Sequence, residues 1–174
     1  MKKSISSVLW EYLKSFLLAV VIALVIRTYF FQITEVYGQS MYPTLHNQDR
    51  LFTNRIVYAL SAPDRGDIVI LDAPDRAGSF YVKRTIAVAG DHISIKDGVV
   101  YRNGEALEEP YINENYTDGD IDTLVPPDTV FVMGDNRGNS HDSRSADVSF
   151  IPVEDIKGKA IFRIWPLDNF GKIE

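Results

Sequence analysis

The sequence predicts a mainly β protein, in which a single transmembrane α-helix precedes a domain of antiparallel strands folded as a barrel-like or coiled sheet. Two observations lead to this class. A stretch near the N-terminus contains no Gly, Pro, Asn or Asp, whereas the rest of the chain alternates short β-rich runs with these turn-forming residues. The 174 residues are 45% hydrophobic and 24% charged, which is ordinary globular composition.

Residues 10–31 are predicted to form the membrane helix, after a cytoplasmic tail of residues 1–9. Eleven apolar residues follow one another without a break from Phe16 to Ile26. A helix over 10–31 would be roughly 33 Å long, enough for the hydrocarbon core of a bilayer. Lysines on the N-terminal side outnumber Arg27 on the other side. The positive-inside rule therefore predicts a single-pass protein of the cell membrane with a cytoplasmic N-terminus and an extracytoplasmic domain.

Two other interpretations of this stretch are open. A cleaved secretory signal needs small residues just after the apolar run, and the sequence there, RTYFFQITEVYG, is bulky. A buried amphipathic helix needs a polar face, and the run is apolar on every face. Both are therefore less favoured than an uncleaved anchor.

Charge and cysteine content exclude several classes of function. The chain has no cysteine, which removes disulfides, thiolate metal sites and thiol nucleophiles. Its net charge is −6, so clustered cations for nucleic acid are absent and we expect no nucleic-acid partner. Residues 1–31 carry a net +3 and the remainder −9, which separates a lipid-bilayer segment from an acidic domain. The oligomeric state stays open.

The extracytoplasmic domain is predicted to span residues 32–174. Asp97-Gly98 and Asn103-Gly104 are hairpin signals flanked by alternating apolar residues. The stretch 108–128 is rich in acids, Asn and Pro and is predicted to be an exposed loop or insertion. The other predicted strands cover residues 49–58, 67–73, 79–90, 128–134 and 159–167.

Ser40 is the first candidate for chemistry. It lies in GQSMYPTL, residues 38–45, directly after the membrane exit. A serine in such a turn is usually structural, and it becomes a nucleophile only if a base activates it.

Lys83 is the candidate base. In the strand SFYVKRTIAVAG it shares a face with Tyr81 and Thr85, while Arg84 points to the other face. Solvation of one face cannot explain a charge on each, so at least one is buried. A lysine can lose its proton, and lowering its pKa from ~10.4 to ~7.5 amounts to roughly 4 kcal/mol, which desolvation can supply. The alternative is an edge-strand lysine that blocks aggregation.

A third polar segment, MGDNRGNSHDSR, follows the strand DTVFV. It is either a solvated loop or a rigid, ion-paired loop that positions Ser140. Together, GQSMYPTL, YVKR and GDNRGNSHDSR resemble the type I (leader) signal peptidase family, in the Gram-positive type with one N-terminal anchor. The order and spacing match, because Lys83 lies 43 residues after Ser40 and Asp135 lies 52 residues after Lys83.

The resemblance implies a membrane-bound serine endopeptidase that removes signal peptides from exported preproteins. Ser40 would be the nucleophile, Lys83 its general base, and Ser140 the hydroxyl that holds the lysine. Some members carry a serine two positions before the nucleophile, where this chain has Gly38. The second donor of the oxyanion hole is therefore open.

The resemblance also implies two ion pairs, one between Arg84 and Asp135 and one between Asp142 and Arg144. No cofactor and no metal is expected. The three histidines would be surface or loop residues. The preprotein would add as an extended strand, and the candidate walls of its pockets are Val36, Met41, Leu45, Tyr81 and Val82.

Two other functions remain open at this point. A self-cleaving regulator would share the Ser–Lys chemistry, but such regulators carry a DNA-binding module where this chain has the apolar stretch. A non-enzymatic, membrane-tethered β domain would bind exported chains without needing Ser40 or Lys83.

Overall fold

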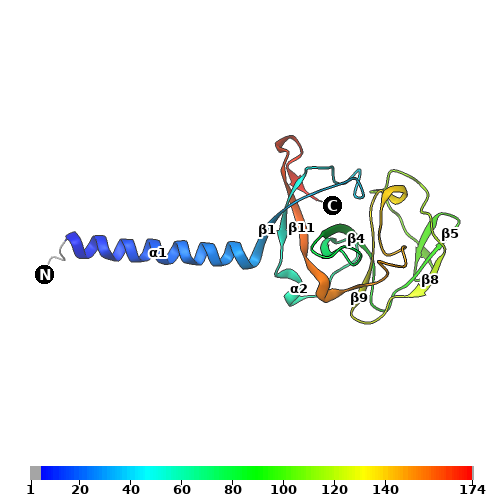
Figure 1. Ribbon diagram of the computed structural model, residues 1–174, viewed down its shortest axis with the longest axis horizontal. Coiled ribbons are helices and arrows are strands. Elements are labelled where there is room, and N and C mark those ends of the chain that lie inside the picture. The colour runs from blue at the N-terminus through cyan, green and yellow to red at the C-terminus, as the bar shows by residue number, and fades with distance from the viewer. Residues whose placement is uncertain (1–4, 174) are drawn as a thin grey trace.

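A computed structural model describes residues 5–173 of the chain, with the backbone alone for residues 5–8 and 25–29. Its first element is helix α1 (Ile5–Phe30), which extends away from a compact β domain (Figure 1). The predicted helix of residues 10–31 largely coincides with α1, and residues 1–4 of the predicted tail lie outside the described residues. Among the described residues, no helix meets the length and apolarity needed to cross a membrane.

The larger of two antiparallel sheets contains eight strands, in the order β1-β2-β11-β3-β4-β9-β10 with β12 beside β11. Some neighbours, such as β3 and β4, follow each other in the chain, whereas β11 lies between β2 and β3 and β9 lies beside β4 after long stretches of sequence. The strands are β1 (Phe31–Glu35), β2 (Arg50–Asn54), β3 (Ile68–Asp72), β4 (Phe80–Val88), β9 (Thr129–Met133), β10 (Ile151–Pro152), β11 (Ile156–Trp165) and β12 (Gly171–Lys172).

The smaller sheet has four strands in the order β7-β6-β5-β8. Both predicted hairpin turns are present, with positive φ at Asp97 and Gly98 and at Asn103 and Gly104, as tight two-residue turns require. Its strands are β5 (His92–Lys96), β6 (Val99–Arg102), β7 (Glu105–Ala106) and β8 (Ile121–Leu124).

Short helices connect the strands. The predicted strand of residues 49–58 ends earlier, at Asn54, because the Asn54 side-chain oxygen accepts hydrogen bonds from the N–H groups of Ile56 and Val57 and turns the chain. In the part of the chain that the structure describes, the short helices are α2 (Val57–Leu60), η1 (Arg137–Asn139), η2 (Val153–Asp155) and η3 (Leu167–Asn169).

The prediction of a mainly β, antiparallel fold is confirmed. The barrel-like form is not, because among the described strands β1 and β10 lie at opposite edges of an open sheet. Within 108–128, predicted to be an exposed loop, the structure places strand β8, and Thr117 and Val125 are buried. This stretch is therefore partly a strand of the smaller sheet.

Two of the apolar clusters position the candidate site. One packs the turn after β1 onto the larger sheet, and it contains Val36, Met41, Leu45, Leu51, Ile68, Ala160 and Ile173. The other joins β4 and β9 to the smaller sheet through Ile86, Ile93, Ile95, Phe131 and Met133, among others. Burial of this apolar surface fixes β4 between the two halves of the domain.

Candidate active site

Ser40 lies on a tight turn that follows β1. The backbone of Val36 donates to Asp49 O (2.8 Å) and accepts from Gln48 N (2.8 Å), so the two ends of the turn are joined. Leu45 and Met41, beneath it, are buried. The turn therefore holds Ser40 half-buried at the surface of the domain.

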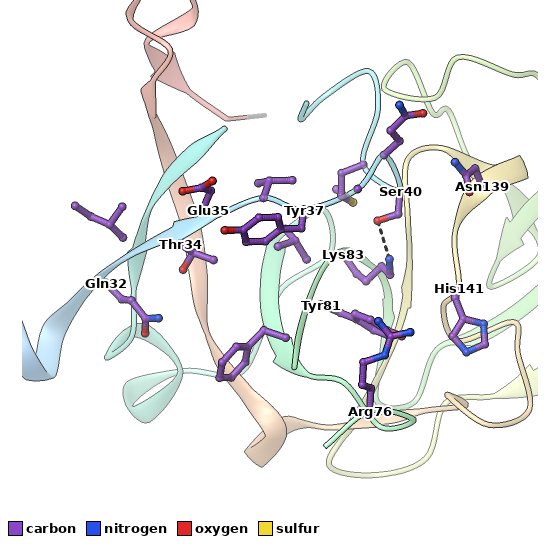
Figure 2. A pocket seen from close by; sticks show the side chains of 17 residues that line it. Gln32, Thr34, Glu35, Tyr37, Ser40, Arg76, Tyr81, Lys83, Asn139 and His141 are labelled. Carbon is purple, nitrogen blue, oxygen red and sulfur yellow. Dashed lines mark hydrogen bonds between the residues drawn. The ribbon is translucent and has the colours of Figure 1, made fainter. Parts of the chain in front are cut away.

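Lys83 meets Ser40 from the neighbouring strand β4. Its Nζ donates a hydrogen bond to Ser40 Oγ at 2.9 Å (Figure 2). The Lys83 side chain is buried, with 3% of the residue exposed, and its Nζ lies 5.0 Å from the centre of the Tyr81 ring. The structure thus brings together the two residues that the sequence predicts as nucleophile and base.

The surroundings of Lys83 favour its neutral form. Burial lowers the pKa of Lys83 from its ordinary value to about 8; the charge of Asp142 opposes this shift and that of Arg144 adds to it. Desolvation acts in this direction because it disfavours the charged form of an amine. A substantial neutral fraction near pH 8 is what a general base requires.

Arg84, the next residue on β4, points to the opposite face and forms a buried ion pair. Its Nε and Nη2 donate to the two carboxylate oxygens of Asp135 at 2.9 and 2.8 Å. Thr44 Oγ1 also donates to Asp135, at 2.6 Å. This pair ties β4 to the end of β9 and to the turn that carries Ser40.

The segment after β9, residues 134–144, is called the site loop below. Within it, Arg144 donates from Nε and Nη2 to the two oxygens of Asp142 at 2.8 and 2.9 Å. Burial alone would raise the pKa of Asp142, but the hydrogen bonds from Arg144 and from the Gly134 N–H keep the pKa below its ordinary value. Asp142 therefore remains a carboxylate.

Gly134 and Ser140 lie in close contact. A Cβ at position 134 would collide with Ser140 Oγ and with the Ser40 carbonyl oxygen, so only glycine lets the site loop approach the Ser40 turn this closely. The Ser140 hydroxyl is buried, and among the described residues it forms no hydrogen bond with Lys83. The predicted contact between these two side chains is therefore not present.

A cleft of about 640 Å³ opens beside Ser40 and Lys83. β1 and the following residues form one side, the start of β4 forms the other, and Asn139 and His141 of the site loop close the end near Ser40 (Figure 2). Among the described strands, β1 pairs only with β2, and residues 80–83 of β4 pair only with β3. Two free strand edges thus border the cleft.

Four of the five predicted wall residues line this cleft: Val36, Met41, Tyr81 and Val82. Leu45 does not. It is completely buried in the core and borders a separate hollow with Gln39, Tyr42, His46 and Asn47. The reason is the helical hydrogen bond from Leu45 N to Met41 O, which turns the Leu45 side chain inward.

Several lining residues were not predicted from the sequence. Ile33, Phe80 and Arg76 border the cleft, and His141 lies at its rim. Period-2 alternation in FQITE could have indicated Ile33, had the strand been separated from the apolar helix before it.

Asp75, His141 and Asp147 form the one group of potential metal ligands among the described residues, with ligand atoms within 4.8 Å of one another. All three residues are exposed. His141 Nε2 already lies 3.0 Å from Asp147 Oδ2, and Tyr81 donates to Asp75. Each of the three side chains therefore already has a polar partner within the protein.

The arrangement described so far is that of a serine hydrolase: a half-buried serine, a buried amine at hydrogen-bonding distance and a strand-edged cleft. Comparison with known proteins places it in a family. The model of the signal peptidase family, peptidase S26, matches residues 9–165. The chain belongs to this family and is a serine endopeptidase.

Relatives are similar over most of their length. "Signal peptidase I S" of Bacillus subtilis is 40% identical over 93% of this chain and 92% of its own. "Signal peptidase I" of Bacillus licheniformis is 39% identical over 95% and 94%. A crystal structure of a signal peptidase I from Enterococcus faecalis has 32% identity and a TM-score of 0.50, covering 57% of this chain and 97% of that one.

Proposed function

We propose that this protein is a membrane-bound signal peptidase that cleaves signal peptides from exported preproteins with a Ser40–Lys83 dyad. The observation that carries the proposal is the 2.9 Å hydrogen bond from the buried Lys83 Nζ to Ser40 Oγ at the edge of the cleft. Family membership supports the substrate class, because the relatives are named signal peptidase I.

The chemistry follows from the geometry. Neutral Lys83 accepts the proton of Ser40 Oγ as that oxygen attacks the scissile carbonyl. The tetrahedral intermediate collapses when the C–N bond breaks and the ammonium of Lys83 gives its proton to the leaving amine. Lys83, neutral again, then takes a proton from a water molecule as the water oxygen attacks the acyl-enzyme ester. The ammonium of Lys83 returns this proton to Ser40 Oγ as the ester C–O bond breaks, which releases the signal peptide as a carboxylic acid and restores Ser40 and neutral Lys83.

The substrate would lie extended in the cleft, hydrogen-bonded between the free edges of β1 and residues 80–83 of β4. Val36, Met41, Tyr81 and Val82 would form the walls of pockets for its side chains. An occupied cleft would also keep water from Lys83, so the same residues would serve specificity and the low pKa of the base.

The supporting residues would hold the dyad rather than react. Arg84 and Asp135 would fix β4 against the Ser40 turn, and Asp142 with Arg144 would give the site loop its shape. Ser140, whose hydroxyl is buried beside Gly134, is the proposed residue for holding the amine of Lys83 during the reaction.

A membrane anchor is the remaining part of the proposal, and it rests on the apolar sequence of residues 10–31. Large apolar side chains of α1 lie exposed on several sides, among them Phe16, Leu17, Leu18 and Val21. Lipid would cover them at no cost in hydrogen bonds, because a helix satisfies its own backbone. With the N-terminus cytoplasmic, the cleft would lie outside the membrane, where signal peptides emerge.

The test is cleavage of a preprotein by the purified full chain in detergent, with the cut site read by mass spectrometry. Ser40→Ala should abolish cleavage because it removes the attacking oxygen, and Lys83→Ala should lower kcat roughly 10²–10⁴-fold because it removes the base. Ser61→Ala and Lys96→Ala, exposed residues that do not line the cleft, are the matched controls. A tethered binding domain would show no cleavage in any variant, and unchanged cleavage in Ser40→Ala would refute the dyad.

A further inference from the structure

A third buried ion pair, outside the predicted site residues, joins the site loop to residues 109–118, a segment called the strap below. Arg137 of the loop donates to Glu109 of the strap from Nη1 at 2.9 Å and from Nη2 at 2.5 Å. The Arg137 side chain is completely buried and that of Glu109 is 6% exposed. Glu109 is therefore the carboxylate that directly compensates the buried charge of Arg137.

Arg137 also has two neutral partners. Its Nη1 donates to Thr117 Oγ1 at 2.7 Å, at the far end of the strap, and its Nε donates to the Gly134 carbonyl at 3.0 Å. One planar guanidinium thus joins both ends of the strap to the start of the site loop. Such a fork of donors is a fixed geometry that a lysine or an amide does not reproduce.

The Gly134 peptide is the point where this pair meets the dyad. Arg137 holds the carbonyl of Gly134, and Asp142 accepts from its N–H at 3.0 Å. Between Gly134 and Arg137, Asn136 donates from its backbone N–H to the Ser40 carbonyl at 3.0 Å. A shift of Arg137 would therefore move the turn that carries the nucleophile.

The strap contacts both of the other ion pairs as well. The Arg84 guanidinium lies 3.9 Å from the centre of the Tyr111 ring, and the Tyr111 hydroxyl donates to Glu109 at 2.9 Å. Arg144 donates to the Asp118 carbonyl at 3.2 Å. The strap thus contacts all three of Arg84, Arg137 and Arg144.

We infer that the Glu109–Arg137 pair is a positioning pair for catalysis: it clamps the strap onto the site loop and so fixes Ser40 and Lys83 in their reactive arrangement. This inference rests on the proposed function. Neither residue touches the cleft, so the pair acts through Gly134 and Asn136. Loosening it would also displace Asp142 and Arg144, the two charges with the largest effect on the pKa of Lys83.

The experiment compares Glu109→Gln, the double variant Glu109→Gln/Arg137→Gln, and the control Glu108→Gln, an exposed glutamate next to the pair. Glu109→Gln leaves Arg137 as an uncompensated buried charge, so it should lower both the melting temperature and kcat. A misplacement of about 1 Å can cost on the order of 10²-fold in rate. KM should change less than kcat, because the walls that β1 and β4 form are untouched. Glu108→Gln should behave as wild type.

The double variant separates positioning from stability. Removing both charges should restore most of the melting temperature, since no unpaired charge remains buried. The rate should stay low, because a neutral side chain cannot hold the Gly134 carbonyl and both ends of the strap together. Recovery of kcat in step with the melting temperature would overturn the inference, as would a Glu109→Gln variant that behaves like the control.

A readout without substrate keeps this test separate from that of the proposed function. The pKa of Lys83 can be followed by NMR of ¹³C-labelled lysine, with the resonance assigned through Lys83→Ala. It should titrate at about 8 in the wild type and closer to 10.5 in the double variant, as water reaches the amine. If the wild type cleaved no preprotein, the proposed function would fail, but this titration would still test the role of the Glu109–Arg137 pair. A Lys83 pKa that is the same in the wild type and the double variant would refute that role.

Discussion

Lys83 and Arg84 are consecutive residues of β4, each only 3% exposed, yet the two faces of the strand treat their charges in opposite ways. On one face Arg84 meets a carboxylate with two hydrogen bonds. On the other face Lys83 meets a hydroxyl, an aromatic ring and apolar side chains. A buried cation with a partner stays charged and fastens the fold, whereas one without a carboxylate partner gives up its proton more easily and becomes chemically useful.

Disrupting the ion pair between Arg84 and Asp135 should have the largest effect on stability. Asp135→Asn removes the charge that Arg84 faces in the interior, and we expect a loss of about 3–5 kcal/mol in the free energy of unfolding. Urea denaturation in detergent would measure it. The double variant Arg84→Met/Asp135→Asn should regain part of that loss, and a single variant as stable as wild type would mean that the pair does not fasten β4.

The burial of Lys83 leads to a prediction of the opposite kind, namely that raising the pH should increase the stability of the protein. The pKa of Lys83 is about 8 in the folded chain and 10.5 ordinarily, so between these values the unfolded state binds more protons and stability rises with pH. The full change corresponds to about 3 kcal/mol. Below pH 8 Lys83 is mostly protonated in the folded protein as well, so the full free-energy cost of burying its ammonium group remains.

Lys83→Met should remove this dependence. The variant should be more stable than wild type at pH 7, and the difference should shrink as the pH approaches 10.5, because neutral lysine and methionine are buried at similar cost. Urea unfolding of both proteins at pH 7 and pH 10 measures the difference and cancels other titrating groups. A gap that is constant with pH would show that Lys83 is charged in the folded protein over this whole range.

An exposed cluster supplies the smallest effect. Asp122 contacts His92 at 2.7 Å and Lys96 at 2.9 Å on the smaller sheet, and all three side chains are about half exposed. Water screens such pairs, so Asp122→Asn should leave the urea midpoint unresolved from wild type. A clear shift would mean that exposure is a poor guide to which pairs stabilise this domain.

Much of the fold could be predicted from the sequence because its signals are local. The two Asx-Gly turns and the alternation around them predicted the β5-β6-β7 hairpins. β1 follows α1 without any turn residue, so no boundary marked its start. β8 lies in an acidic stretch and forms a strand by pairing with β5, some 28 residues earlier. No local sequence pattern indicates this long-range pairing.

For the site, the order of motifs predicted that Ser40 and Lys83 belong together, and the puzzle of adjacent charges on β4 predicted that at least one is buried. The sequence does not predict the Glu109–Arg137 pair, because its two residues lie 28 positions apart and the acids, Asn and Pro of residues 108–128 indicate an exposed loop. The prediction that Leu45 lines the cleft is wrong, because a single helical turn directs its side chain into the core. No sequence pattern indicates this turn.

The unpaired edges that border the cleft have a consequence for cleavage accuracy. A peptide bound as a strand presents alternate side chains to the same wall, so sliding it by one residue exchanges the inward set for the outward one, while sliding it by two restores the pattern. With Ser40 fixed on its turn, errors in the cut should therefore fall two residues from the correct bond far more often than one. The alternation of side chains along the bound strand would then determine which cleavage errors occur.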